Sequence, residues 1–360
     1  MSDHLSILSE KAIQLLKSLI STPSFSRDES ATADLIAEFL QERGIETQRI
    51  GNNVVARNKH FDSSKRTVLL NSHHDTVKPN AQYTRDPFSP DIEDGKLYGL
   101  GSNDAGGCLV SLIATFLHFH PKSDLAYNVM LAATAEEEIS GSGGVELITP
   151  HLPPIDCALV GEPTKLDLAV AERGLMVLDC VAQGQAGHAA RNEGINALEL
   201  ALDDIQWIRN HQFAHVSDLL GACKMTVTVI ETPNKAHNVI PAECKFVVDV
   251  RVNELYSFEE ILEEIRSNIS ATITPRSFRL RSTSIATDHP LVKAGIKMGR
   301  NPYGSPTTSD KALMPFPALK TGPGDSARSH SANEYIYIDE IRGGIEHYIH
   351  LIEHLQQSSS

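Results

Sequence analysis

The stretch of residues 128–144 constrains this chain most, because an apolar run leads directly into adjacent carboxylates. Residues 129–133 are apolar, and Glu136, Glu137 and Glu138 follow them before a group of glycines. A short apolar run bounded by turn residues predicts a buried strand in a parallel sheet. Adjacent carboxylates at the end of such a strand repel one another and lose hydration unless a cation lies beside them. The alternative, a solvated acidic loop, explains this stretch equally well when it is considered alone.

Composition restricts the class of protein further. A chain of 360 residues with an apolar share of 41% is typical of a globular protein of about two domains. The net charge of −14 argues against a nucleic-acid partner and against binding to anionic membranes. The N-terminus has no signal-peptide pattern, no run approaches the ~20 apolar residues of a membrane span, and the five dispersed cysteines have no CxxC spacing. We therefore expect a cytoplasmic protein with reduced thiols.

Apolar spacing predicts alternating helices and strands in the first half of the chain. A helical period covers residues 5–20, and Ser26 with Glu29 predicts a capping box that opens the following helix. Short apolar runs bounded by turn residues predict buried strands at residues 67–71 and 156–160. This alternation is typical of an α/β domain with a mostly parallel sheet.

The pattern changes near Gly174 and changes back after Pro290. Between these points the expected order is strand, helix, strand, strand, helix, strand, with the last strand over residues 278–283. This is the ferredoxin-like order. We therefore expect an α/β protein whose mixed, mostly parallel sheet is flanked by helices and which carries an inserted ferredoxin-like α+β domain. The expected catalytic domain comprises residues 1–173 and 286–360, and the expected lid or dimerisation domain comprises residues 174–285.

Residues that commonly bind metals stand at four predicted strand ends, and a further histidine stands late in the chain. They are His73 with Asp75, Asp104, the run Glu136 to Glu138, Glu162, and His330. Taken singly, each has a structural explanation: a histidine after a strand is more often only hydrogen-bonded, and Asp104 could cap a helix. Together, imidazole and carboxylate groups favour a catalytic zinc site. Five ligands suffice for two metals with open positions only if one carboxylate bridges them, which is the known two-metal arrangement for hydrolysis.

Five segments carry a resemblance to a known family. They are Ser72-His73-His74-Asp75-Thr76-Val77, Gly101-Ser102-Asn103-Asp104, Glu136-Glu137-Glu138, Gly161-Glu162-Pro163-Thr164, and Gly322-Pro323-Gly324-Asp325-Ser326 through His330. On these segments, and over nearly its whole length, the chain resembles the M20 metallopeptidase family. Glu136 stands where the family usually has Asp, and Ser72 stands where it often has Gly. Neither position is expected to hold a metal.

The resemblance implies a centre of two Zn²⁺ ions, for which Co²⁺ can substitute. Asp104 would bridge the two ions. His73 and Glu162 would complete one site, and Glu138 and His330 would complete the other. All five are therefore candidate metal ligands.

The resemblance also implies two residues that act beside the metals. Asp75 would orient His73, which suits their spacing at a strand end. Glu137 would be the general base that takes a proton from the attacking water and passes it to the leaving amine. Neighbouring residues of an extended segment point in opposite directions, which suits different roles for Glu137 and Glu138.

Further positions concern the substrate and a second subunit. The resemblance implies a homodimer in which His188 and the segment starting at Asn238 reach the partner's site; the alternative for His188 is an ordinary surface histidine. Arg251 could clamp a substrate carboxylate, or it could equally form a strand-end salt bridge. Ser309 and Gly324 are expected to line the substrate pocket.

The implied activity is hydrolysis of a linear amide by a di-zinc enzyme. Within the family, the segment from Gly322 to Tyr335 looks most like the deacylases of arginine biosynthesis, so the expected substrate is N2-acetyl-L-ornithine, which would give L-ornithine and acetate. N-acetylcitrulline and N-succinylornithine are close variants, and succinyl-diaminopimelate desuccinylase or an M20 dipeptidase or carboxypeptidase is the alternative. Two non-enzymatic alternatives are an inactive ligand-binding homologue and a metal-free structural protein. No expected ligand or base is missing from the sequence.

Overall fold

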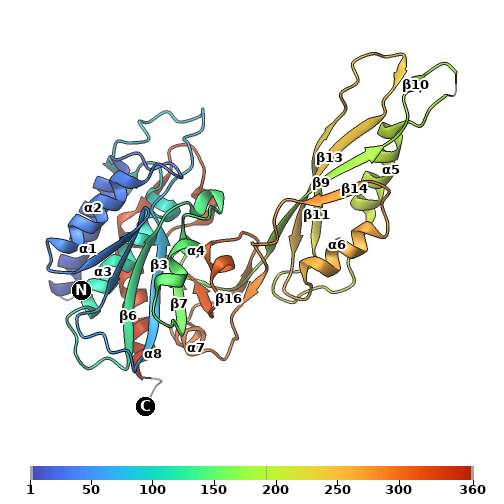
Figure 1. Ribbon diagram of the computed structural model, residues 1–360. Coiled ribbons are helices and arrows are strands. Elements are labelled where there is room, and N and C mark those ends of the chain that lie inside the picture. Colours follow the sequence, from blue (N-terminus) through green and yellow to red (C-terminus); the bar gives the residue numbers. More distant parts are fainter. Residues whose placement is uncertain (1–2, 192, 358–360) are drawn as a thin grey trace. The chain divides into compact units, whose positions relative to one another are not determined.

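The computed structural model describes residues 3–191 and 193–357, and the chain divides into two compact units (Figure 1). The first unit comprises residues 1–170, 285–303 and 309–360. The second unit comprises residues 171–284 and 304–308.

The first unit is built on a mixed sheet. Its strands, in spatial order, are β1 (Thr47–Ile50), β2 (Asn53–Arg57), β6 (Tyr127–Thr134), β3 (Arg66–His73), β7 (Cys157–Val160), β17 (Ala318–Lys320) and β8 (Leu168–Glu172). The four central strands β6, β3, β7 and β17 pair in parallel, whereas β1, β2 and β8 pair antiparallel to their neighbours. The predicted mostly parallel sheet is therefore confirmed.

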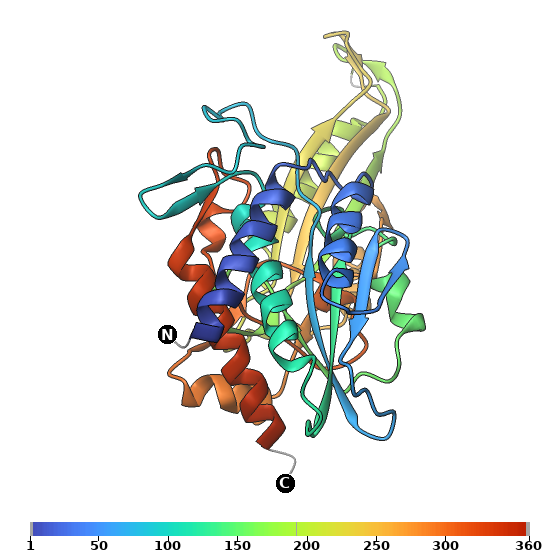
Figure 2. The same cartoon turned by 90° about the vertical axis from the view of Figure 1, so that its left-hand side faces the viewer.

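Helices cover both faces of this sheet. They are α1 (Asp3–Ile20), α2 (Ser30–Gln41), α3 (Gly107–Phe119), α4 (Val145–Ile148), α7 (Pro290–Lys297) and α8 (Ile338–Gln357). Helices α1, α3 and α8 lie side by side over one face (Figure 2). The short helix α4 packs on the other face.

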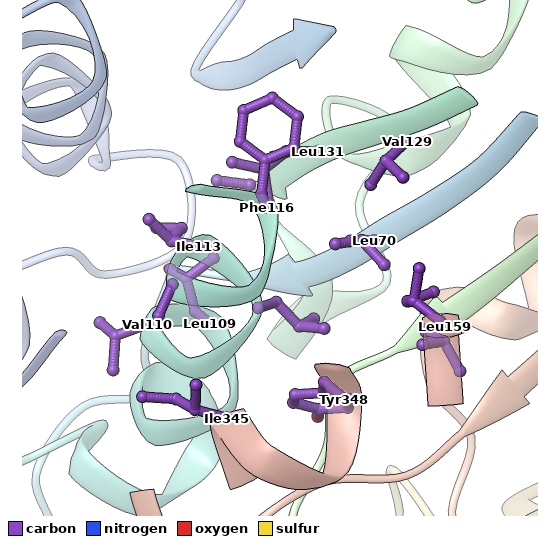
Figure 3. Packing of buried hydrophobic residues seen from close by; sticks show 14 of the residues in the cluster. Leu70, Leu109, Val110, Ile113, Phe116, Val129, Leu131, Leu159, Ile345 and Tyr348 are labelled. Carbon is purple, nitrogen blue, oxygen red and sulfur yellow. The ribbon is translucent and has the colours of Figure 1, made fainter. Parts of the chain in front are cut away.

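Alternation along the central strands explains why both faces are covered. Leu70 and Leu131 pack against α3 and α8 on one face (Figure 3), whereas Leu69 and Met130 pack on the face of α4. Successive side chains of a strand point to opposite faces, so a strand without polar residues needs an apolar layer on each side. Each such side chain stabilises the fold by about 1.5–3 kcal/mol on burial. The strand ends are thereby held on a rigid frame.

The predicted capping box before α2 is wrong. Helix α2 starts after Glu29 without a side-chain cap, and Ser26 Oγ instead donates to Asp75 Oδ2 at 2.7 Å. The buried Glu29 carboxylate accepts from the backbone N–H of Arg27 at 2.6 Å and of Glu136 at 3.2 Å. Both residues are thus engaged by loops that are distant in sequence, which a local capping pattern does not reveal.

Five short strands remain, some of them near the points where the chain passes from one unit to the other. Strands β18 (Tyr335–Tyr337), β5 (Lys96–Tyr98) and β4 (Ile92–Glu93) form a three-stranded antiparallel sheet. Strands β15 (Thr283–Ser284) and β16 (Pro302–Ser305) pair with β8.

The second unit has the predicted order of strands and helices. Its antiparallel sheet runs β11 (Lys224–Glu231), β13 (Glu243–Val252), β9 (Gly174–Gln183) and β14 (Thr272–Pro275) in space, with α5 (Ala197–Asn210) and α6 (Phe258–Arg266) as its helices. A two-stranded ribbon of β10 (Gly187–His188) and β12 (Val239–Ile240) extends it. The ferredoxin-like insert is confirmed, but its last strand is not at residues 278–283. Strand β14 lies earlier because Ile273 buries its side chain in the core of this unit.

Candidate metal centre

The carboxyl ends of three parallel strands bring the candidate ligands together. His73 is the last residue of β3, Glu137 and Glu138 lie in the turn directly after β6, and Glu162 lies two residues after β7. Parallel neighbours end at the same edge of a sheet, where open α/β sheets carry their sites. Asp104 joins them from the helical turn that precedes α3.

His73 points one ring nitrogen into a group of carboxylates. Its Nε2 lies 3.4 Å from Asp104 Oδ1, 3.8 Å from Glu162 Oε1 and 3.9 Å from Glu137 Oε2. This nitrogen is buried and has no hydrogen-bond partner. A buried ring nitrogen without a partner, surrounded by carboxylates, fits a metal ligand.

Asp104 lies between the two histidines. Its Oδ1 faces His73, and its Oδ2 lies 3.7 Å from His330 Nε2. His330 Nε2 also lies 2.9 Å from Glu138 Oε2. One carboxylate therefore turns its two oxygens toward two imidazoles, as a bridging ligand must.

Two groups of three residues can each place ligand atoms within 4.8 Å of one another. The first is His73, Asp104 and Glu138, and the second is His73, Glu137 and Glu162. Four of the five predicted ligands belong to these groups, and the fifth, His330, lies 2.9 Å from Glu138 Oε2. The second group also includes Glu137, to which the resemblance gave the role of a base rather than of a ligand. The imidazole and carboxylate donors suit zinc, cobalt and similar divalent ions.

The electrostatics of this cluster favour a cation. Burial raises the pKa of Glu137 well above its usual range, and burial together with the charge of Asp104 raises the pKa of Glu162 to about 8. The hydrogen bond to Glu138 raises the pKa of His330 to about 9, against the opposing effect of burial. Carboxylates crowded into a buried site are stabilised in their ionised form by a divalent ion, which reverses these shifts.

Asp75 contacts more of the site than its spacing indicated. Its backbone oxygen lies 3.0 Å from His73 Nδ1, which orients the imidazole. Its carboxylate accepts from the backbone N–H of Glu137 at 3.1 Å and of Glu138 at 3.2 Å. Burial by itself would raise the pKa of Asp75, but the interaction with His73 outweighs it and lowers the pKa. The residue therefore links β3 to the acidic turn after β6.

Three further buried carboxylates of this region were not among the candidate site residues. Asp310 accepts from Asn71 Nδ2 at 2.9 Å and from Thr134 Oγ1 at 2.7 Å. Glu29 accepts from the backbone N–H of Glu136. Glu334 accepts from the backbone N–H groups of Asn103 and Asp104, in the loop before α3. Asp310 directly follows the pocket candidate Ser309, and Glu334 lies in the segment from Gly322 to Tyr335 that carries the resemblance to deacylases, which was the available signal.

The candidate substrate residues fall in both units. In the first unit, Ser309 is buried and its side chain caps a short helical turn. Gly324 has a φ of 90°, and a Cβ at this position would lie 2.5 Å from Asn103 Oδ1. In the second, Arg251 forms a two-pronged ion pair with Asp249 of its own strand, at 2.8 and 3.0 Å. The salt-bridge alternative for Arg251 is thus observed in the structure.

The ribbon of the second unit carries the remaining two candidates. His188 is exposed on β10, and its Nδ1 accepts from the backbone N–H of Ala190 at 3.2 Å. Asn238 directly precedes β12, and its backbone oxygen accepts from the N–H of Ala189 at 3.0 Å. The two residues therefore lie next to one another on one ribbon.

None of the helices among the described residues combines the length and the apolarity that crossing a membrane requires. All five cysteines are buried free thiols.

Known proteins resemble this chain in sequence and in fold. Residues 69–354 match the model of a family described as Peptidase family M20/M25/M40. A succinyl-diaminopimelate desuccinylase of a Ruegeria species is 27% identical over 274 residues, which cover 72% of this chain and 69% of that protein. An acetylornithine deacetylase of Pectobacterium carotovorum is 28% identical over an alignment of 377 positions. The alignment covers 94% of this chain and 97% of that protein.

Two solved structures share the fold. Aminopeptidase PepT from Bacillus cereus has a TM-score of 0.78 at 16% identity, covering 96% of this chain and 98% of its own. A protein of Bacillus subtilis described as a dinuclear metal binding peptidase from the M20 family has a TM-score of 0.74 at 15% identity, covering 98% of this chain and 99% of its own.

Proposed function

The chain belongs to peptidase family M20/M25/M40 and is a metal-dependent amidohydrolase of that family; on this premise we propose that it removes the acyl group from an N2-acyl amino acid with two metal ions. The observation that carries the proposal is the carboxylate of Asp104, which lies 3.4 Å from His73 Nε2 and 3.7 Å from His330 Nε2. A carboxylate in such a position could serve two ions at once.

The five ligands divide into two sites around this carboxylate. His73 and Glu162 would hold one ion, and Glu138 and His330 would hold the other. The proposed ions are Zn²⁺, with Co²⁺ as a substitute, and the imidazole and carboxylate donors are compatible with both. When bound, they polarise the scissile carbonyl and lower the pKa of water.

Glu137 is the proton carrier of the proposed reaction. Its carboxylate lies 3.9 Å from His73 Nε2, inside the ligand cluster, where it can accept a proton from the attacking water and return it to the leaving amine. Its backbone N–H donates to Asp75, which fixes the direction in which its side chain leaves the turn. The adjacent Glu138 is directed to His330 instead, which supports different roles for the two residues.

The proposed substrate is N2-acetyl-L-ornithine. Its support is the segment from Gly322 to Tyr335 and the acetylornithine deacetylase that matches this chain over nearly the full length of both proteins. N-acetylcitrulline and N-succinylornithine are close variants. Hydrolysis of succinyl-diaminopimelate is the second candidate, because desuccinylases match at 27–28% identity over 72% of this chain.

The proposal includes a homodimer in the cytoplasm. His188 and Asn238 lie together on the ribbon of the second unit and would complete the site of the partner, where His188 stabilises the developing oxyanion. Arg251, Ser309 and Gly324 would contact the substrate. Edge strand β11 is compatible with an association of subunits, because the backbone N–H and C=O groups along an edge strand can pair with another strand.

A metal and substrate assay tests the proposal. We expect about two divalent ions per chain, loss of activity with a chelator and its return with Zn²⁺ or Co²⁺. N2-acetyl-L-ornithine should be hydrolysed faster than N-acetylcitrulline, N-succinylornithine, succinyl-diaminopimelate or dipeptides. Full activity in protein shown by elemental analysis to be free of metal would overturn the two-metal reaction, and preference for a succinyl substrate would overturn only the choice of substrate.

A further inference from the structure

A buried carboxylate outside the ligand set holds the loop that carries Asp104. Glu334 is 1% exposed, and its Oε1 accepts from the backbone N–H of Asn103 and of Asp104, each at 2.9 Å. Its Oε2 accepts from the N–H of Gly101 at 3.3 Å. The backbone oxygen of Glu334 accepts in addition from the N–H of Gly99 at 3.0 Å.

This loop needs such an anchor because it is not held by regular helical hydrogen bonds. Asp104 has φ −119° and ψ 98°, which are not helical values, although the helical turn surrounds it. Its N–H and that of Asn103 therefore depend on partners outside the helix, and buried backbone donors without partners destabilise a fold. Asn103 adds a second tie, because its side chain exchanges hydrogen bonds with the backbone of Asp325 at 3.0 and 3.1 Å.

Asp75 and Glu334 act alike on the two acidic segments of the site. Asp75 accepts the N–H groups of Glu137 and Glu138, and Glu334 accepts that of Asp104. In both cases a buried carboxylate that is not itself a candidate ligand fixes the backbone of candidate ligands or of the base candidate. A fixed backbone matters most at Asp104, because its two carboxylate oxygens face two different histidines.

We propose that Glu334 is a positioning residue for the metal centre: its carboxylate fixes the backbone of Asp104, and thereby the orientation in which that side chain reaches both ions. The inference rests on the proposed function, since it assigns Glu334 a role toward the two ions. Residues that orient metal ligands typically contribute 10–100-fold to metal affinity.

The second unit offers a matched control. Asp204 is also buried, and its carboxylate accepts from the backbone N–H of Ser270 at 2.8 Å and of Ala271 at 2.9 Å. It anchors the segment before β14 and belongs to no ligand group. Glu334→Ala and Asp204→Ala therefore remove the same kind of anchor, and both are expected to lower the midpoint of thermal unfolding.

Calorimetric titration of the chelator-treated full-length protein with Zn²⁺ and with Co²⁺ distinguishes a positioning role at the metal centre from a general contribution to stability. We expect two ions for the wild type, an affinity about 10–100-fold weaker at one site or both in Glu334→Ala, and unchanged affinities in Asp204→Ala. The visible absorption spectrum of the Co²⁺ form should change in Glu334→Ala alone. Wild-type affinity and spectrum in Glu334→Ala would overturn the inference while leaving the proposed function intact.

A second variant keeps the test decisive if Glu334→Ala does not fold. In Glu334→Gln, an amide oxygen in the place of Oε1 keeps the two bonds of 2.9 Å and loses the one of 3.3 Å. Because the bond to the backbone of Asp104 is kept, we expect the affinity to fall by less than about tenfold. A loss of about 10–100-fold in this variant would contradict a positioning role that acts through that bond. A wild-type protein that binds neither ion would overturn the proposed function itself, and this inference with it.

Discussion

The sheets of the two units bury their side chains in different ways. All eight residues of β6 in the first unit are buried, whereas β11 of the second unit is exposed along most of its length. The first sheet has helices on both faces, and the second has one protected face and an open edge. The doubly covered first sheet can keep the candidate ligands at fixed distances, whereas the second unit has an exposed edge strand.

The largest predicted effect tests the proposed catalytic role of the first unit and is expected at Glu137. Glu137→Ala should lower kcat by about 10²–10⁴-fold while both metals stay bound, because it removes the proton carrier. Glu138→Ala should instead weaken binding of one ion, because it removes a ligand. Kinetics combined with elemental analysis checks both. Equal metal loss in the two variants, or near-wild-type kcat in Glu137→Ala, would mean that the two roles are not distinct.

A mixing experiment asks whether the second unit serves the site of a partner subunit. His188→Ala should lower activity by about 10²–10³-fold if His188 stabilises an oxyanion. Mixing it with Glu137→Ala under conditions that exchange subunits should restore roughly a quarter of wild-type activity, because half of the dimers are mixed and each has one intact site.

The controls for mixing are the two single variants incubated alone. No recovery in mixed dimers verified by mass spectrometry would place His188 in the site of its own chain, or outside the site altogether. A protein that stays monomeric at assay concentration would also contradict the proposed exchange.

Stability should respond unequally in the two sheets. Leu131 is fully buried on β6 (Figure 3), so Leu131→Ala should lower the free energy of unfolding by about 2–5 kcal/mol. Val229 on β11 is 46% exposed, so Val229→Thr should change it by no more than about 0.5 kcal/mol. Urea unfolding checks both, and sedimentation would reveal whether Val229→Thr weakens association. Similar losses in the two variants would contradict the contrast between the sheets.

The last prediction concerns the dependence of stability on pH in the first unit. Burial, with added repulsion from Arg300 and His350, lowers the pKa of His347 to about 3. As the pH falls, the imidazole of His347 is therefore protonated in the unfolded chain first, near pH 6.5. The contribution of neutral His347 to the free energy of unfolding is complete above that pH and declines as the pH falls toward about 3. His347→Gln should flatten the pH dependence of urea unfolding in this range. An unchanged slope would show that other groups determine it.

The sequence by itself determined the central strands and the residues at their ends. Strand β6 is recognisable from its apolar run, and the parallel neighbours His73, Glu138 and Glu162 follow from where such runs stop. These are local properties of the chain, because alternation and termination depend on residues a few positions apart. The order of elements in the insert was recognisable for the same reason, although β14 lies a few residues before its predicted place.

Only the tertiary structure decided which groups hold those ligands in place. Glu334 lies 231 residues from Asn103, whose N–H it accepts, and Glu29 lies 107 residues from Glu136. Glu29 was predicted to cap the start of α2, but its carboxylate meets a backbone donor of the acidic turn instead. A backbone N–H is present at every residue except proline, so no sequence pattern marks the one that a buried carboxylate meets. That choice is made where distant loops come together in space and each buried polar group must find a partner.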